Sequence, residues 1–229
     1  MMHQVMSSTC QQGLDDFNLL YLPGASGNTA FWQPVLSRLE ISAQHTVLAY
    51  PSFAGQAAHP KVQCFEDLQR YVLAQIPEQT VIVAQSMGGI FAVQAARQQP
   101  QKVRALVLVA TSGGIDLTPF DAQDWREQYL HDFDVPDWFA TTPSDAVHTA
   151  LQQLHCPVLL IWGDQDPISP VAVGQYLAQQ LQHAELHVIA GGQHDLAAVH
   201  ADEVSALIQA FLQRIGLNAQ LRLDRKDQH

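Results

Sequence analysis

The sequence predicts an α/β fold, with a mostly parallel twisted sheet, helices on both faces and a short helical cap insertion. Three observations along the 229 residues carry this prediction. Short apolar runs recur, they are continuous rather than alternating, and longer helical segments separate them. Continuous apolar strands suit a sheet that is covered on both faces. Strands that alternate with helices form right-handed crossover units.

Six apolar runs are the expected strands, and their Val, Leu and Ile content favours strand over buried helix. They are Leu19–Leu22, Thr46–Tyr50, Val81–Ala84, Ala105–Val109, Val158–Trp162 and Leu186–Ile189. The longer segments between them are the expected helices. These are Phe31–Leu39, Phe65–Ile76, Met87–Arg97, Pro170–Leu181 and Asp202–Ile215. Ser169 and Pro170 match an N-cap followed by a proline at the first helical position.

The alternation of strands and helices breaks once. Residues 113–155 contain two or three expected helices and no strand, whereas residues 1–112 and 156–229 carry the alternating pattern. The sequence therefore predicts one α/β core domain with a helical cap inserted at 113–155.

The cap segment is rich in aromatic residues at helical spacing. Trp125, Tyr129 and Phe133 are four residues apart, which places them on one helical face. Trp138 follows soon after. Two compatible interpretations stay open: the helices close a small core of their own, or they form a lid whose aromatic face covers an apolar substrate pocket. These four side chains are the candidate pocket residues.

The charge balance excludes several classes of protein. Lys and Arg total 11 and Asp and Glu total 22, which gives a net charge of −11. Without a basic cluster, the chain lacks the groups that neutralise nucleic-acid phosphates or attract an anionic membrane. The longest apolar runs are also too short to cross a bilayer. The expected partner is a small-molecule substrate, not a nucleic acid or a membrane, and the sequence sets no oligomeric state.

The cysteine pattern indicates a reducing compartment. Cys10, Cys64 and Cys156 are odd in number and widely spaced, so they predict neither a disulfide framework nor a CxxC metal motif. The segment MMHQVMSSTCQQG lacks the cationic and apolar regions of a signal peptide. We therefore expect a cytoplasmic location.

The strongest chemical signal is VIVAQSMGGIFAVQAA, where an expected strand runs directly into an expected helix. Ser86 stands at the junction, within the pattern Ala84-x-Ser86-x-Gly88. So tight a turn forces the serine into a strained backbone conformation and requires small neighbours. It lifts the hydroxyl clear of the sheet and places the N–H of Met87 at a helix N-terminus, which stabilises an oxyanion. An ordinary serine in a βα loop is the alternative.

This junction resembles the nucleophile elbow of the α/β-hydrolase family, G-x-S-x-G, with Ala84 in place of the first glycine. The resemblance implies that Ser86 is a catalytic nucleophile. The segment LLYLPGASGN resembles the family's loop after its third strand, with Pro-Gly-Ala at 23–25 where His-Gly is common. This resemblance makes the N–H of Ala25 the second oxyanion donor beside Met87. A proline cannot supply the hydrogen bonds of a histidine, so the loop must be braced differently.

A serine nucleophile needs a base, and the base needs an orienting acid. In this family the order along the chain is serine, acid, histidine. The segment CPVLLIWGDQDPISP resembles the acid-bearing loop and implies that Asp166 is the acid, with Asp164 in reserve. The segment LHVIAGGQHDLAAVH resembles the histidine loop and implies that His194 is the base. Each follows the carboxyl end of an expected strand, where open α/β sheets place their sites.

A simpler interpretation of these residues stays open. Asp166 could only cap the turn before Pro167, and His194 could be a surface histidine like others among the 11 in the chain. His187 and His200 do not stand at the family's position.

Together, these residues predict a serine hydrolase that cleaves a small to medium carboxylic ester through an acyl-enzyme. A thioesterase or carbon–carbon bond hydrolase with the same three residues, a non-catalytic receptor of the same fold, and a scaffold that dimerises through its cap are the alternatives. No cofactor is expected, because GxGxxG and GxxxxGK[ST] loops are absent from the sequence. No metal is expected, because the histidines lack HExxH-type spacing.

Overall fold

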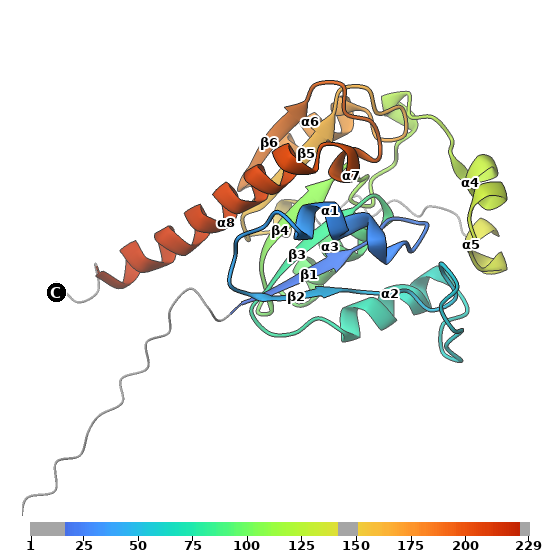
Figure 1. Ribbon diagram of the computed structural model, residues 1–229, viewed down its shortest axis with the longest axis horizontal. Coiled ribbons are helices and arrows are strands. Elements are labelled where there is room, and N and C mark those ends of the chain that lie inside the picture. The colour runs from blue at the N-terminus through green and yellow to red at the C-terminus, as the bar shows by residue number, and fades with distance from the viewer. Residues whose placement is uncertain (1–16, 142–150, 225–229) are drawn as a thin grey trace, which may run out of the picture.

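The computed structural model describes residues 17–141 and 151–224. Within them, six strands form one sheet in the order β2-β1-β3-β4-β5-β6, and every neighbouring pair is parallel (Figure 1). The strands are β1 (Asn18–Leu22), β2 (Gln44–Val47), β3 (Thr80–Gln85), β4 (Val103–Val109), β5 (Val158–Gly163) and β6 (Ala184–Ile189). The prediction of a parallel α/β sheet is confirmed. All carboxyl ends of the strands therefore lie at one edge of the sheet.

Helices cover both faces of this sheet. On one face lie α1 (Gln33–Leu36), α7 (Leu196–Val199) and α8 (Ala201–Asp224), which Figure 1 shows in front of the strands. On the other lie α2 (Phe65–Ala74), α3 (Met87–Gln98) and α6 (Val171–Gln180). Successive strand residues alternate between the faces: Val83 and Val107 pack under the first layer, and Ile82 and Leu106 under the second. This double burial explains the continuous apolar runs.

The second strand is shifted from its expected position. Thr46–Tyr50 was the expected range, but the strand pairing with β1 covers Gln44–Val47. β2 lies at the edge of the sheet, and its residues alternate between exposed and half-buried. Tyr50 leaves the sheet entirely, and its buried hydroxyl donates a hydrogen bond to the carbonyl of Pro23 (2.9 Å). The apolar run thus combines an edge strand with a buried loop.

Three helix predictions also need correction. The expected helix Phe31–Leu39 divides into a 3-10 turn, η1 (Thr29–Trp32), and the short α1. Pro170 is the N-cap of α6 rather than its first residue, because its ψ of 154° is not helical and its carbonyl accepts from the N–H of Val173 (2.8 Å). α8 continues to Asp224, beyond the expected end at Ile215, since a single glycine lowers helix stability by only ~1 kcal/mol.

The segment between β4 and β5 contains helices and no strand within its described residues. These are η2 (Thr118–Phe120), α4 (Arg126–Asp132), α5 (Asp137–Thr141) and η3 (Leu151–Gln153); residues 142–150 of the predicted cap lie outside the description. Phe53 connects this segment to the core, with ring centroids 5.9 Å from Trp138 and 5.5 Å from Phe139. The domain limits at 113–155 stay a prediction. Over the described ranges, no helix is long and apolar enough to span a membrane.

Candidate active site

The turn between β3 and α3 has the geometry that the sequence predicts for an elbow. Ser86 adopts φ 51° and ψ −121°, a strained conformation for a residue with a Cβ atom. Two hydrogen bonds hold it there: its N–H donates to the carbonyl of Val109 (3.1 Å), and its carbonyl accepts from the Thr111 hydroxyl (2.5 Å). Both partners follow from β4 lying beside β3. The neighbouring strand thus fixes the position of the serine.

Close packing explains the small residues around this turn. A Cβ atom on Gly88 would lie 2.7 Å from the carbonyl oxygens of both Leu22 and Pro23. The first turn of α3 therefore touches the backbone at the end of β1, and only glycine permits this approach. Ala84, which replaces the first glycine of the motif, is fully buried within the core, so the fold accommodates its methyl group.

Three side chains from three loops form a continuous chain of hydrogen bonds. Nε2 of His194 lies 3.0 Å from Oγ of Ser86, and Nδ1 of the same ring lies 2.9 Å from Oδ2 of Asp166. The carboxylate side chain is 0 % exposed and the imidazole 21 % exposed. The residues follow β3, β5 and β6, so the parallel sheet brings them together at its carboxyl edge.

Asp166 makes the contacts of both interpretations that the sequence left open. Its Oδ1 atom accepts hydrogen bonds from the N–H groups of Ile168 (2.8 Å) and Ser169 (3.1 Å), so it does cap the turn. Its Oδ2 atom remains for the imidazole of His194. The reserve candidate Asp164 has a different partner, because its Oδ1 accepts from the N–H of Gly191 (2.7 Å). The structure thus separates the two acids by their contacts.

The loop that carries the histidine is braced by residues that the sequence did not single out for this task. Nε2 of Gln85, the residue before the serine, donates to the carbonyl of His194 (3.2 Å). Gly163 and Gly192 are in close contact, so a Cβ atom on Gly163 would overlap the carbonyl of Gly192. No local pattern reveals these contacts, since they join positions far apart in the chain.

The two N–H groups expected as oxyanion donors are those of Ala25 and Met87. Within the described residues, the N–H groups of Ala25 and Met87 donate to no backbone acceptor. Met87 begins α3, where the helix dipole favours negative charge. The loop of Ala25 is braced without a histidine, since the hydroxyl of Tyr50 donates to the carbonyl of Pro23. Both expected donors therefore lie next to the turn at Ser86. Tyr50 braces the loop of Ala25 in place of the histidine that this chain lacks.

A cavity of about 820 Å³ opens beside Ser86 and His194. Of the four candidate pocket residues, Trp125 lines it, whereas Tyr129, Phe133 and Trp138 do not. A role of these three residues in the pocket stays a prediction, and the structure shows their rings in other contacts. Tyr129 packs between Trp125 and Phe133, with ring centroids 4.9 Å and 4.3 Å away, and Trp138 packs on Phe53.

Leu130 and Phe139 of the cap also line the cavity. Phe133 is 44 % exposed to solvent. Burial raises the pKa of the Tyr129 hydroxyl, and hydrogen bonding to Ser26 lowers it. Because Ser26 directly follows Ala25, Tyr129 connects the cap to the loop of the second oxyanion donor.

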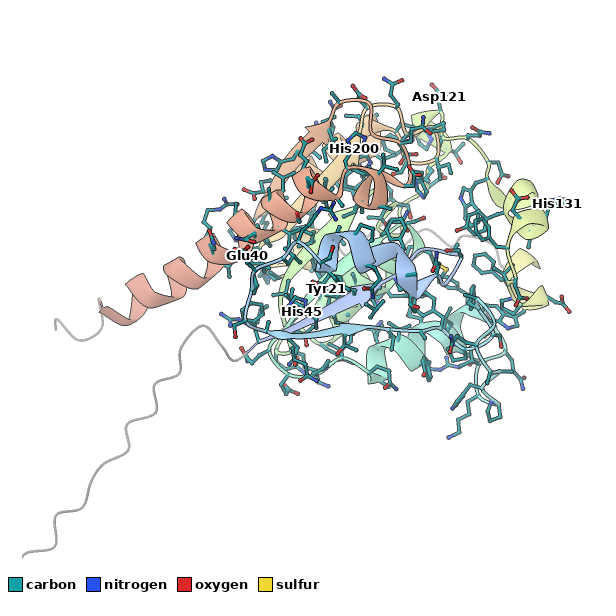
Figure 2. All side chains as sticks on the ribbon, viewed as in Figure 1. Tyr21, Glu40, His45, Asp121, His131 and His200 are labelled. Carbon is teal, nitrogen blue, oxygen red and sulfur yellow. The ribbon has the colours of Figure 1, made fainter. Side chains whose placement is uncertain are left out.

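Other histidines lie away from this arrangement. Figure 2 shows His131 on α4 at the outer side of the molecule and His200 between α7 and α8. His45 stacks on Tyr21 across β1 and β2, with ring centroids 5.8 Å apart. Among the described residues, no three His, Cys, Asp or Glu side chains are placed to hold a metal ion.

Comparisons with known proteins agree with this fold. The model of the alpha/beta hydrolase fold family matches residues 18–154 and 132–201. A pimeloyl-[acyl-carrier protein] methyl ester esterase of Aliivibrio salmonicida is 25% identical over 86% of this chain and 92% of its own length. Serine hydrolase BPHL of Mus musculus is 27% identical over 59% of this chain and 55% of its own.

Solved structures share the fold. A putative lipase of Acinetobacter baumannii superposes with a TM-score of 0.72 at 19% identity, covering 88% of this chain and 85% of that one. A thermophilic esterase of Thermogutta terrifontis gives a TM-score of 0.65 at 17% identity, covering 87% and 90%. With the elbow, the parallel sheet and the family match together, this chain belongs to the alpha/beta hydrolase fold family.

Proposed function

We propose that this chain is a serine esterase that cleaves small to medium carboxylic esters through an acyl-enzyme on Ser86. The chain is an ester hydrolase of the α/β type, in keeping with its relatives. The single observation that carries the finer proposal is the hydrogen-bonded chain from Ser86 through His194 to Asp166, which opens onto a cavity.

In the proposed reaction, Oγ of Ser86 attacks the ester carbonyl carbon while Nε2 of His194 takes the hydroxyl proton. The charge that develops on the carbonyl oxygen is bound by the N–H groups of Ala25 and Met87. His194 then gives its proton to the departing alkoxide, and an alcohol leaves. Water, deprotonated by the same imidazole, attacks the acyl-enzyme and releases the carboxylic acid.

Asp166 has the supporting role in both steps. Its carboxylate accepts from Nδ1 of His194, which keeps the other nitrogen free to act as the base. Because the carboxylate is fully buried, it also stabilises the imidazolium formed in each half-reaction.

The cavity supports a substrate of modest size. A volume of about 820 Å³ lies within the range of sites for small organic ligands. Several relatives are methyl ester esterases by name, which supports a small alcohol as the leaving group. The partner we propose is thus a small-molecule ester. A cytoplasmic location is part of the proposal and is supported by the cysteine pattern, with Cys64 and Cys156 as free thiols.

A fluorophosphonate probe and an ester panel test this proposal, with Ser86→Ala as the matched control. We expect the probe to label the wild-type chain and not the variant. We also expect kcat for a short methyl or nitrophenyl ester to fall by roughly 10³-fold or more in the variant. A folded wild-type chain that resists the probe would indicate a receptor. Turnover of thioesters or vinylogous diones but not esters would move the function to those reactions.

A further inference from the structure

Gln85 places a buried amide next to the proposed nucleophile. It is the last residue of β3 and only 5 % exposed, although the strand residues before it, from Val81 to Ala84, are apolar. Side chains alternate along a strand, so Gln85 points to the same face as Val81 and Val83, the face that α7 covers. Burying an amide costs free energy unless its polar atoms find partners. The contacts of Gln85 therefore explain why a polar side chain stands there.

The amide nitrogen of Gln85 fixes the main chain of the proposed base. Its Nε2 atom donates to the carbonyl of His194 over 3.2 Å. Within residues 17–141 and 151–224, the main chain of His194 forms no other hydrogen bond. The imidazole of the same residue reaches Oγ of Ser86. Since Gln85 and Ser86 are neighbours in the chain, the first holds the backbone of His194 while the second meets its ring.

The amide oxygen of Gln85 lies against the loop of the second proposed oxyanion donor. A Cβ atom on Gly24 would lie 2.3 Å from Oε1 and 3.3 Å from Cδ of Gln85. The amide therefore packs on the backbone of Gly24, directly before Ala25. One side chain thus contacts both the loop that carries the base and the loop that carries a donor N–H.

Other contacts of the histidine loop leave the backbone of His194 unsupported. Asp164 accepts from the N–H of Gly191, three residues earlier in the chain. Asp166 contacts the imidazole and not the main chain. A misplacement of about 1 Å at a reacting group can lower a rate roughly 10²-fold. The hydrogen bond from Gln85 therefore acts where the position of the base is set.

We propose that Gln85 is a positioning residue for the hydrolysis. Its amide holds His194 at the distance from Ser86 that proton transfer requires. The same amide rests on the loop of Ala25, so that base, nucleophile and donor keep a fixed spacing. Gln85 acts through the backbone of His194 rather than on the substrate. The inference depends on the proposed esterase function, which makes His194 the base.

Three replacements of Gln85 separate its hydrogen bond from its volume. Gln85→Met keeps the length of the side chain and loses the donor, whereas Gln85→Glu keeps the shape and turns an acceptor toward the carbonyl. We expect kcat for a short ester to fall about 10- to 100-fold in both, with KM within about twofold of wild type. KM should hold because Gln85 does not line the cavity. Gln85→His should recover most of kcat above neutral pH, since its ring N–H has a similar reach.

Gln99→Met is the matched control. Nε2 of Gln99 donates to the carbonyl of Leu73 (3.1 Å), so the variant loses the same kind of hydrogen bond just beyond the other end of α3. That position lies about 20 Å from Ser86 along the helix axis. We expect kcat at the wild-type value. Equal losses of kcat in Gln99→Met and Gln85→Met would assign the effect to a general loosening of the fold and overturn the inference.

Gly24→Ala tests the second contact of the amide. The φ of Gly24 lies outside the left-handed region, so the backbone accepts alanine, but the new Cβ atom displaces Oε1 of Gln85. We expect kcat to fall about tenfold in the wild-type chain. The fall should be smaller in a chain that already carries Gln85→Ala, where the displaced oxygen is absent. Equal falls in both chains would overturn the link between the two loops.

The outcomes separate the inference from the function on which it depends. Wild-type kcat in Gln85→Met, or in Gln85→Glu if the methionine variant does not fold, would overturn the inference while the esterase function stands. So would a histidine variant as slow as Gln85→Met, because shape and not the hydrogen bond would then decide the rate. A folded wild-type chain that hydrolyses no ester and resists the fluorophosphonate probe would refute the proposed function itself, and the inference with it.

Discussion

Single residues at the elbow illustrate how contacts decide roles that local sequence leaves open. Asp164 and Asp166 stand two positions apart on the same loop, and both accept hydrogen bonds from the backbone. They differ in the direction of the remaining oxygen. Asp166 turns one carboxylate oxygen toward His194, whereas Asp164 holds Gly191 in the loop that carries that histidine. One acid orients the proposed base, and the other supports its loop.

Replacing each aspartate by asparagine separates these roles. In Asp166→Asn, the N–H groups of Ile168 and Ser169 keep the amide oxygen in place, so the NH2 group faces His194. An NH2 group cannot accept from Nδ1, and the imidazole is held in the wrong tautomer. We expect kcat for a short ester to fall roughly 10⁴-fold.

Asp164→Asn is the control for this prediction. Its amide oxygen can still accept from Gly191, so we expect less than a tenfold change in kcat and about 1 kcal/mol or less in unfolding free energy. Steady-state kinetics and urea denaturation measure the two quantities. A larger loss of activity at 164 than at 166 would reverse the assignment.

The sequence predicted much of this site because its residues stand in recognisable loops. Ser86, Asp166 and His194 each follow an apolar strand, and parallel strands bring such positions to one edge. Gln85 and Tyr50 were not predicted as braces, since their partners lie 109 and 27 residues away. The sequence pattern alone does not show whether these residues act in catalysis or only support the site. Measurements of activity test their roles.

At the scale of elements, the contact between α3 and β1 determines how the elbow is built. The first turn of the helix lies against the carbonyl groups of Leu22 and Pro23, and the loop after them carries Ala25. A shift of α3 would therefore move both proposed oxyanion donors relative to each other. The helix range was predicted to within a residue, because its apolar pattern is local. The extra turns of α8 and the shift of β2 were not predicted, because they depend on neighbours rather than on local sequence.

Gly88→Ala tests this contact, because the contact and helix propensity predict changes of opposite sign in the unfolding free energy. Alanine forms helix better than glycine by about 1 kcal/mol, so helix propensity alone predicts stabilisation. The clash with two backbone carbonyl oxygens predicts the opposite, a loss of roughly 1–3 kcal/mol of unfolding free energy. Chemical denaturation followed by circular dichroism gives the answer.

Gly55→Ala serves as the comparison. A Cβ atom on Gly55 would meet nothing within 4 Å, but its φ of +74° is unfavourable for alanine. We expect a loss of about 1 kcal/mol from this backbone strain alone. If Gly88→Ala proves stabilising, the close approach of α3 and β1 is not the constraint described above.

Across the whole molecule, the tryptophans report on different layers. Trp32 and Trp162 are fully buried, one in each of the two apolar clusters that flank the sheet. Trp125 and Trp138 are partly buried and belong to the cap segment. Among the described residues, those between Ile115 and Leu151 contribute nothing to the fully buried clusters. The described cap residues instead pack against one cluster as partly buried side chains, a distinction that the aromatic pattern in the sequence did not reveal.

We expect the cap to open at lower denaturant concentration than the core, because segments with few buried apolar side chains unfold locally. Acrylamide quenching of fluorescence should increase first for Trp125 and Trp138. The variant carrying Trp125→Phe and Trp138→Phe retains only the buried pair, Trp32 and Trp162, and should show one late transition. An early transition in this variant, or a single transition shared by all four tryptophans, would contradict the difference in stability between the layers.

Because all described strands are parallel, their amino ends lie at one edge of the sheet and their carboxyl ends, with the candidate active site, at the other. Turns at the amino ends of the strands, such as the one between α3 and β4, face away from Ser86 and carry no contact to it. Insertions of tags, dyes or whole binding modules at that edge should leave chemistry intact. Changes at the opposite edge should redirect it, so evolution and protein engineers can vary attachment and reactivity independently.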